Sequence, residues 1–151
     1  IKSQSIDVVL AFCDSGLLSL TSYYSTPQYA GYNVYVPFLM LVMLTVPVIN
    51  LEFIQALILH GCNVNGRAGY TKQLISIERL YLRDIPHCLS TPLELAILQD
   101  NCTVSRILLE SGAFVSVWVN PNIYKLFWFA SPEMKRLLEE AGLPPIEFGR
   151  Y

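Results

Sequence analysis

The chain has 151 residues and a formal net charge of −2; 53% of its residues are hydrophobic and only 15% are charged. This length and composition are typical of one globular domain that buries its core without disulfides or metals, and they exclude a disordered chain. Ten Lys and Arg against twelve Asp and Glu argue against nucleic acid as the main ligand, because phosphate binding relies on clustered cations.

The first predicted helix lies ahead of Gly16, where Val8, Val9 and Phe12 repeat at helical spacing. A polar, tyrosine-rich connection over residues 20–35 follows it. A second helix is predicted from Pro37 to just before Pro47, with an alternative start at Thr26–Pro27. The side chains expected to point inward from this helix are Phe38, Leu41 and Val42.

No formally charged side chain occurs between Asp14 and Glu52, which raises the question of a membrane span. The apolar run over residues 34–49 is shorter than the roughly 20 residues that a spanning helix needs, and a proline lies near each of its ends. No Lys or Arg flanks the run. We therefore expect a helix that is buried on all sides, and no membrane segment.

The third predicted helix begins at Leu51 and ends before Gly61. An insertion over residues 66–89 follows, and a short helical turn is predicted within it, over residues 75–82. The clearest signal comes next. Thr91 can cap a helix whose first turn begins at Pro92, and that helix stops around residues 100–101.

A second helix follows within residues 90–113, and its apolar side chains recur at helical spacing. These side chains are Val104, Ile107, Leu108 and Leu109. Gly112 comes after this helix and is expected to be its left-handed C-terminal cap. Two short antiparallel helices cannot bury their faces alone, so neighbouring units are expected. The last two helices are predicted to start near Asn120–Pro121 and at Ser131–Pro132. The second of these helices covers Glu133–Glu140. The inward residues of the first are Ile123, Leu126 and Phe127.

The block at residues 90–113 resembles the ankyrin repeat, whose Thr-Pro-Leu-His-x-Ala opening and Leu-Leu-x-x-Gly-Ala ending are matched at residues 91–96 and 108–113. Glu94 stands where the family has His, which changes the expected hydrogen bonds at the turn. The ending recurs at residues 51–65 and around Gly16, and more loosely near the C-terminal end, with the equivalents of its glycine at Gly61, Gly16 and Ala141. The resemblance implies an all-α ankyrin-type solenoid with enlarged loops. Its parts are a partial repeat (1–19), two repeats (36–65 and 90–116), an inserted loop (66–89) and a degenerate or capping repeat (119–142).

Residues that could carry chemistry are few. His60 and Cys62 together with His87 and Cys88 supply the donors of a tetrahedral zinc site, but their spacing fits no standard module and Cys62 serves as a small packed residue of a repeat. We therefore predict no metal, no cofactor and no catalytic residues. Without CxxC pairs or a leader, the four cysteines are expected to be free thiols in the cytosol or nucleus. Because the first residue is Ile1, the chain is expected to be part of a longer protein.

Three groups of residues are candidates for binding. Arg and Tyr lie together in the insertion, as in interface hot spots; exposed positions of the inner helices form the second group, and an aromatic cluster near the C-terminal end forms the third. The tyrosine run from Tyr23 to Tyr35 is expected to pack internally. The predicted contact residues are Tyr70, Arg79, Tyr81, Arg83, Glu94, Leu95, Leu98, Gln99, Trp118 and Trp128.

The function that the resemblance implies is protein recognition without catalysis, as a scaffold or adaptor that docks a partner of unknown identity or further repeats of the same chain. One alternative is the substrate-recognition arm of a cullin-type ubiquitin ligase, since residues 131–142 are similar to the last repeat of ankyrin proteins that carry a SOCS box. Another alternative is a regulatory or targeting domain of a larger enzyme.

Overall fold

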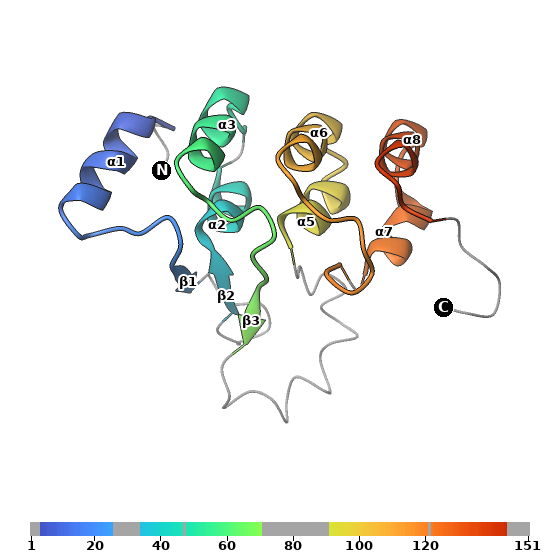
Figure 1. The fold of residues 1–151 in the computed structure, drawn as a ribbon, viewed down its shortest axis with the longest axis horizontal. Helices are drawn as coiled ribbons and strands as arrows, with labels where there is room; N and C mark the ends of the chain where they lie inside the picture. Colours follow the sequence, from blue (N-terminus) through green and yellow to red (C-terminus); the bar gives the residue numbers. More distant parts are fainter. Residues whose placement is uncertain (1–3, 26–33, 47, 71–90, 121, 145–151) are drawn as a thin grey trace.

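The computed structural model describes residues 4–25, 34–46, 48–70, 91–120 and 122–144, and within them the chain is mostly helical. The helices lie in two rows (Figure 1). The outer row holds α1 (Ile6–Asp14), α3 (Leu51–Leu59), α6 (Cys102–Glu110) and α8 (Pro132–Glu140). The inner row holds α2 (Phe38–Thr45), α5 (Pro92–Leu98) and α7 (Ile123–Phe129). Neighbours within each row pack against one another, and α5 also packs against α6 across the rows.

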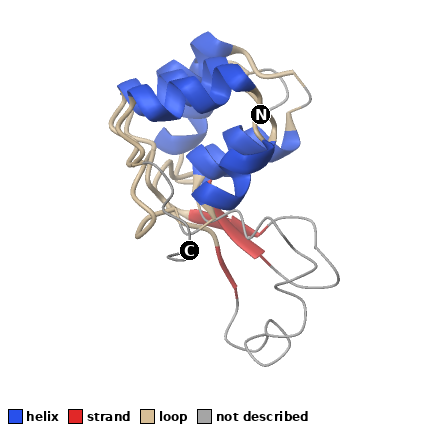
Figure 2. Ribbon diagram, turned by 90° about the vertical axis from the view of Figure 1, so that its right-hand side faces the viewer, coloured by secondary structure: helices blue, strands red, loops and turns tan. Residues whose placement is uncertain are grey.

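A small antiparallel sheet lies beside the helices (Figure 2), in the order β1 (Tyr23–Ser25), β2 (Val34–Pro37) and β3 (Gly69–Tyr70). The chain is mostly helical, but the sheet shows that it is not all-α, and β1 lies within the predicted tyrosine-rich connection over residues 20–35. Val36 is buried, and the Tyr24 ring meets the Phe38 ring edge-on at 5.8 Å between centroids. The first two strands therefore cover the start of α2 and contribute to the core.

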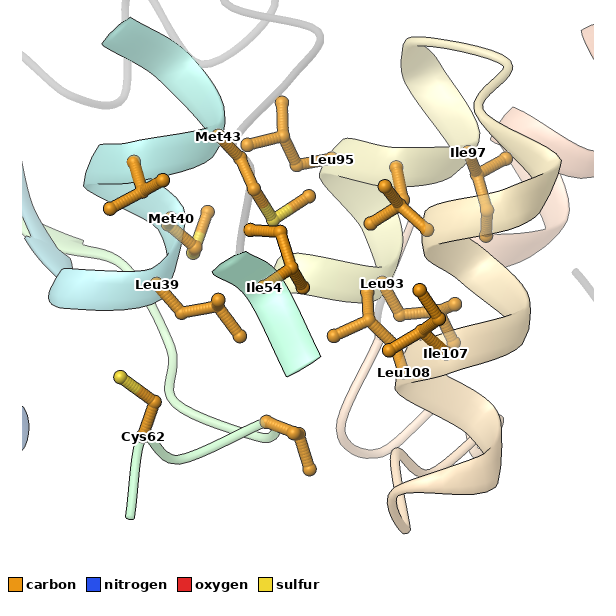
Figure 3. Close-up of a cluster of buried hydrophobic side chains, with 14 of the residues drawn as sticks. Leu39, Met40, Met43, Ile54, Cys62, Leu93, Leu95, Ile97, Ile107 and Leu108 are labelled. Carbon is orange, nitrogen blue, oxygen red and sulfur yellow. The ribbon is translucent and has the colours of Figure 1, made fainter. Parts of the chain in front are cut away.

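Helix α2 is the uncharged apolar helix that the sequence predicts, and its burial is confirmed. The side chains of Phe38 and Val42 are fully buried, whereas Leu41 is only half-buried. Leu39, Met40 and Met43 belong to the same apolar cluster as Ile54 of α3 and Leu93 of α5 (Figure 3). Among the described residues, no helix is long and apolar enough to cross a membrane.

The four outer helices share one register. Each begins after a residue whose side chain accepts a hydrogen bond from the first turn, namely Ser5, Asn50, Asn101 and Ser131. Eleven residues after that cap, each reaches a glycine with positive φ, namely Gly16, Gly61, Gly112 and Gly142. The predicted equivalence of Ala141 is therefore wrong by one residue, because Ala141 is the right-handed C-cap residue that precedes this glycine.

The same closing hydrogen bond follows each glycine. The N–H of the next residue donates to the carbonyl five positions earlier, at donor–acceptor distances of 2.9–3.0 Å, in the pairs Leu17 with Phe12, Cys62 with Leu57, Ala113 with Leu108, and Leu143 with Leu138. This 6→1 bond requires a left-handed residue directly before the donor, a conformation that glycine adopts without steric cost. The four outer helices are thus repeated in geometry as well as in spacing.

Several predicted helix boundaries are confirmed. Helix α5 begins at Pro92, and the Thr91 hydroxyl accepts from the Glu94 N–H at 3.1 Å. Ser131 caps α8 in the same way, and α7 follows residues 120–121 as expected. The predicted turn over residues 75–82 and the alternative helix start at Thr26 lie outside the described residues.

Candidate interaction surface

Glu94 and Leu95 do not offer contact surface to a partner, which corrects their predicted role. Both side chains are buried, with exposed fractions of 0% and 2%. A Glu94 carboxylate oxygen accepts from the backbone N–H of Asn122 at 2.8 Å, which ties α5 to the start of α7. Leu95 belongs to the core cluster with Met43 (Figure 3).

Thr91 and Asn120 form a second link between the same two units. The Thr91 hydroxyl donates to the Asn120 side-chain oxygen at 2.6 Å, and the Asn120 amide donates to the carbonyls of Phe114 and Ser116. Both side chains are 1% exposed. Because buried polar groups with satisfied hydrogen bonds hold their neighbours in one geometry, these contacts fix α7 relative to α5.

Leu98 and Gln99 lie at the C-terminal end of α5 and are exposed, as the sequence prediction requires of contact residues. The Leu98 side chain retains 44% of its accessible surface. The Gln99 amide donates to the carbonyl of Met43 at 3.3 Å, which holds that side chain against the end of α2. This end of the inner row therefore combines an exposed apolar residue with a positioned polar one.

The aromatic cluster of the C-terminal unit is divided between core and surface. Tyr124 is buried, and its hydroxyl donates to the carbonyl of Pro144 at 2.6 Å. Phe127 is half-buried, with the Lys135 ammonium 5.8 Å from its ring centroid. The exposed members are Trp118, Trp128 and Phe129, at 87%, 58% and 88%.

Trp128 and Phe129, the last two residues of α7, correspond to Leu98 and Gln99, the last residue and the C-cap of α5, when both pairs are counted from the cap of the following outer helix. Counted back from the caps Asn101 and Ser131, Leu98 and Trp128 are each three residues away, and Gln99 and Phe129 are each two. Helices α5 and α7 are packed neighbours in the inner row. We call this set of four residues, at equivalent ends of adjacent helices, the α5–α7 edge.

The α5–α7 edge carries little charge. In the described inner helices the charged residues are the buried Glu94 and the exposed Lys125. The outer row, in contrast, exposes Asp7, Glu52 and Glu110 together with the charged face of α8. A partner at the edge would therefore meet apolar and uncharged polar groups, with the carboxylate of the exposed Asp100 directly beside Gln99.

Phe114 is an exposed aromatic residue that the sequence prediction missed. Its side chain is 57% exposed, while its backbone N–H donates to the Asn65 side-chain oxygen at 2.9 Å. The Asn65 amide in turn donates to the carbonyl of Gly112 at 3.1 Å. Its exposure could have been inferred from its position in the repeat, because Phe114 lies two residues after Gly112, where the preceding unit has the polar Asn63 two residues after Gly61.

The inserted loop contributes little to the described site. Tyr70 lies in β3, the strand that pairs with β2. The other three predicted contact residues of the insertion, Arg79, Tyr81 and Arg83, lie outside the described residues. Their role remains a prediction.

Cys62 packs in the core, as the packing interpretation predicts. Its side chain is 5% exposed, and burial raises the pKa of its thiol to about 12, with a smaller contribution from Cys13. Among the described residues no three metal-ligating side chains gather, and Cys13, Cys62 and Cys102 are free thiols. His87 and Cys88, the other half of the alternative zinc site, lie outside the described part of the chain.

A polar hollow of about 560 Å³ lies between residues 99–103 and 131–133. Partial desolvation, together with the nearby carboxylates of Glu133 and Asp100, raises the pKa of the Cys102 thiol in this hollow. A thiol with a raised pKa is protonated at neutral pH and is a poor nucleophile.

No protein-family model, no curated protein and no solved structure matches this chain.

Proposed function

We propose that the chain is an ankyrin-type helical-repeat module that binds a partner protein and catalyses no reaction. The observation that supports this proposal best is the common register of the four outer helices, from side-chain cap to left-handed glycine. Stacked units of this kind form an extended surface, whereas a catalytic site needs convergent groups in a cleft. Recognition on a rigid surface is the function that suits such an arrangement.

The α5–α7 edge is the proposed docking surface. It presents Trp128, Phe129 and Leu98, and tryptophan is among the residues that most often dominate the binding energy of interfaces. The N-terminal ends of α5 and α7 are held together by the Glu94–Asn122 and Thr91–Asn120 hydrogen bonds, and at the edge itself the Gln99 amide is bonded to the carbonyl of Met43. Docking on a surface that is already ordered loses little conformational entropy, which favours affinity. Because the exposed side chains of the edge are mainly apolar, the partner's contact segment is apolar and carries little charge.

Affinity capture with a double variant tests this surface. Trp128→Ser with Phe129→Ser removes the two exposed aromatic side chains of the edge, and we expect a protein retained by the wild-type chain to be lost. Leu59→Ser with Val48→Ser is the matched control, because these residues are 83% and 79% exposed; Leu59 is the last residue of α3, and Val48 precedes the cap of that helix by two residues. All variants should keep the wild-type melting temperature, since exposed side chains contribute little to stability.

The proposal fails if the aromatic double variant and the control retain the same proteins as the wild-type chain. The same capture with Arg79→Glu and Arg83→Glu tests the predicted role of the insertion separately. If only that variant loses the partner, binding belongs to the insertion and the α5–α7 edge is the wrong surface. In both cases the bound protein should be identified and rebound in purified form.

A further inference from the structure

Two exposed aromatic residues, Phe114 and Trp118, lie outside the α5–α7 edge. Both belong to the loop of residues 111–120, which follows α6 and leads toward the N-terminal end of α7. The edge lies at the opposite, C-terminal ends of α5 and α7. The two aromatic side chains are 57% and 87% exposed, so this loop presents apolar surface that docking at the edge does not use.

The loop of residues 60–68, which follows α3, lies beside the loop that carries these aromatic residues. Asn65 joins the two loops, because its side-chain oxygen accepts from the N–H of Phe114 at 2.9 Å and its amide donates to the carbonyl of Gly112 at 3.1 Å. In Figure 1 both loops descend from the outer row past the inner row. The exposed side chains of the two loops therefore belong to neighbouring parts of one surface.

The backbone of both loops is held in place. The buried Asn120 amide donates to the carbonyl of Phe114 at 2.6 Å, and the N–H of Trp118 donates to a serine hydroxyl two residues earlier at 3.1 Å. In the other loop, Gly66 approaches Pro37 so closely that a Cβ atom there would lie 2.7 Å from the proline ring. A surface with a fixed backbone loses little conformational entropy when a partner binds.

Arg67 gives this surface a positive charge. It directly follows the buried Gly66, its own side chain is exposed, and it forms no salt bridge with any described residue. Residues 60–68 and 111–120 contain no Asp, Glu or Lys, so Arg67 is the permanent charge of the two loops. This cation stands out in a chain whose formal net charge is −2.

An arginine near exposed aromatic residues suits a carboxylate that is flanked by apolar groups. A guanidinium can donate two parallel hydrogen bonds to one carboxylate, and Trp and Arg are among the residues most enriched in interface hot spots. Phosphate binding by nucleic-acid ligands relies on clustered cations, and these loops contain one. An uncharged apolar segment would cover Arg67 without pairing its charge, which is costly. Charge complementarity therefore favours an acidic protein segment.

We propose that Phe114, Trp118 and Arg67 form a second docking surface, for an acidic segment of a partner protein in which Asp or Glu lies beside aromatic or aliphatic residues. The carboxylate pairs with Arg67, and the apolar side chains pack on the two aromatic rings. This surface differs from the α5–α7 edge in place and in ligand chemistry, because the four residues of the edge include no cation. The proposal therefore goes beyond the function proposed above, and either surface can fail without the other.

Selection of random peptides displayed on phage, with the purified chain as bait, tests the proposal. We expect the selected peptides to be enriched in Asp and Glu next to Trp, Phe or Leu, although the negative net charge of the chain by itself favours basic peptides. The most frequent peptide is then synthesised, and its Kd is measured from the fluorescence of Trp118. A Trp128→Phe chain serves for this measurement, because it keeps Trp118 as its only tryptophan.

Variants of the surface give the specific readout. Arg67→Gln and Phe114→Ala should each weaken binding of the acidic peptide about tenfold, as the loss of a hot-spot contact does. Arg67→Glu should reverse the charge preference, so that a new selection yields peptides rich in Lys and Arg. Arg106→Gln is the matched control, because Arg106 is an exposed arginine of the outer helix α6, and it should leave the Kd unchanged. All of these side chains are exposed, so the melting temperature should stay at the wild-type value.

The proposal is overturned if the selection yields no acidic peptides, or if Arg67→Gln and Phe114→Ala bind the acidic peptide as tightly as the wild-type chain. It is also overturned if calorimetry shows that Trp128→Ser with Phe129→Ser abolishes peptide binding while Phe114→Ala retains it. Binding would then occur at the α5–α7 edge and would support the proposed function alone. A failed capture experiment at the edge, in contrast, leaves the peptide result standing.

Discussion

Replacing Ser105 by alanine is predicted to stabilise the protein. Ser105 lies in the middle of α6 with an exposed fraction of 0%, and its hydroxyl has no hydrogen-bond partner in the described structure. It stands seven residues before Gly112, where the units of Gly16 and Gly61 have the aliphatic residues Val9 and Ile54. The site is thus an apolar position that carries a buried hydroxyl.

The size of the effect follows from the cost of that hydroxyl. An unsatisfied buried polar group costs about 1–3 kcal/mol, and alanine removes it without leaving a large cavity. Alanine also has a higher helix propensity than serine, by a few tenths of a kcal/mol. Part of the gain is offset by lost van der Waals contacts. We expect Ser105→Ala to raise the free energy of unfolding by about 1–2 kcal/mol, which for a domain of this size is roughly 2–8 °C in melting temperature.

Urea denaturation followed by circular dichroism measures the change directly. Thr103→Ala is the matched control, because Thr103 is exposed on the same helix and reports propensity without burial. The control should change the free energy of unfolding by no more than about 0.5 kcal/mol. If Ser105→Ala is neutral or destabilising relative to this control, the hydroxyl has a partner in solution and the reasoning about its burial is wrong.

Two further predictions concern buried groups. Thr91→Val removes the cap of α5 and the bond to Asn120, so we expect the free energy of unfolding to fall by about 1–3 kcal/mol; an unchanged urea midpoint would contradict the role of these bonds. Burial raises the Cys62 pKa from 9.0 to about 12 in the folded protein. This thiol therefore contributes full stability below about pH 9, and the contribution declines as the pH rises toward 12, because the unfolded chain ionises first. Cys62→Ala should show a shallower decline in urea denaturation between about pH 8 and pH 11, and an identical decline would refute the assignment.

Much of the helical framework could be predicted from local signals. The cap and proline at Thr91 and Pro92 and the glycine at Gly112 act through backbone geometry within one turn, so their roles are visible without tertiary context. Local sequence alone does not decide which residue ends α8 in the left-handed conformation, because Ala141 and Gly142 are both small residues that could follow the helix. The 6→1 bond from Leu143 to Leu138 requires the glycine at Gly142. The strands depend on pairing between distant segments, which residues 20–35 do not reveal on their own.

The contact surface was harder to predict, because exposure depends on neighbouring units. Glu94 is a charged residue in a motif position and is predicted to face a partner, but its carboxylate accepts a hydrogen bond from the N–H of Asn122, 28 residues away, and is buried. Leu95 and Leu98 look alike in sequence, yet Leu95 is buried in the core cluster, whereas Leu98 is 44% exposed. The exposure of Trp118 and Trp128 could be predicted, because their aromatic cluster is larger than one helix face can bury.

The central claim is that the four described outer helices share one register, and that only α1 among them leaves the position four residues before its glycine exposed. The most direct measurement compares the free energies of unfolding of four alanine variants at the position four residues before the glycine. Leu57→Ala, Leu108→Ala and Leu138→Ala should each cost about 2–5 kcal/mol, as expected for fully buried leucines, while Phe12→Ala should cost less than about 1.5 kcal/mol. A leucine variant as stable as the wild-type chain, or a Phe12 variant as unstable as the leucine variants, would contradict it.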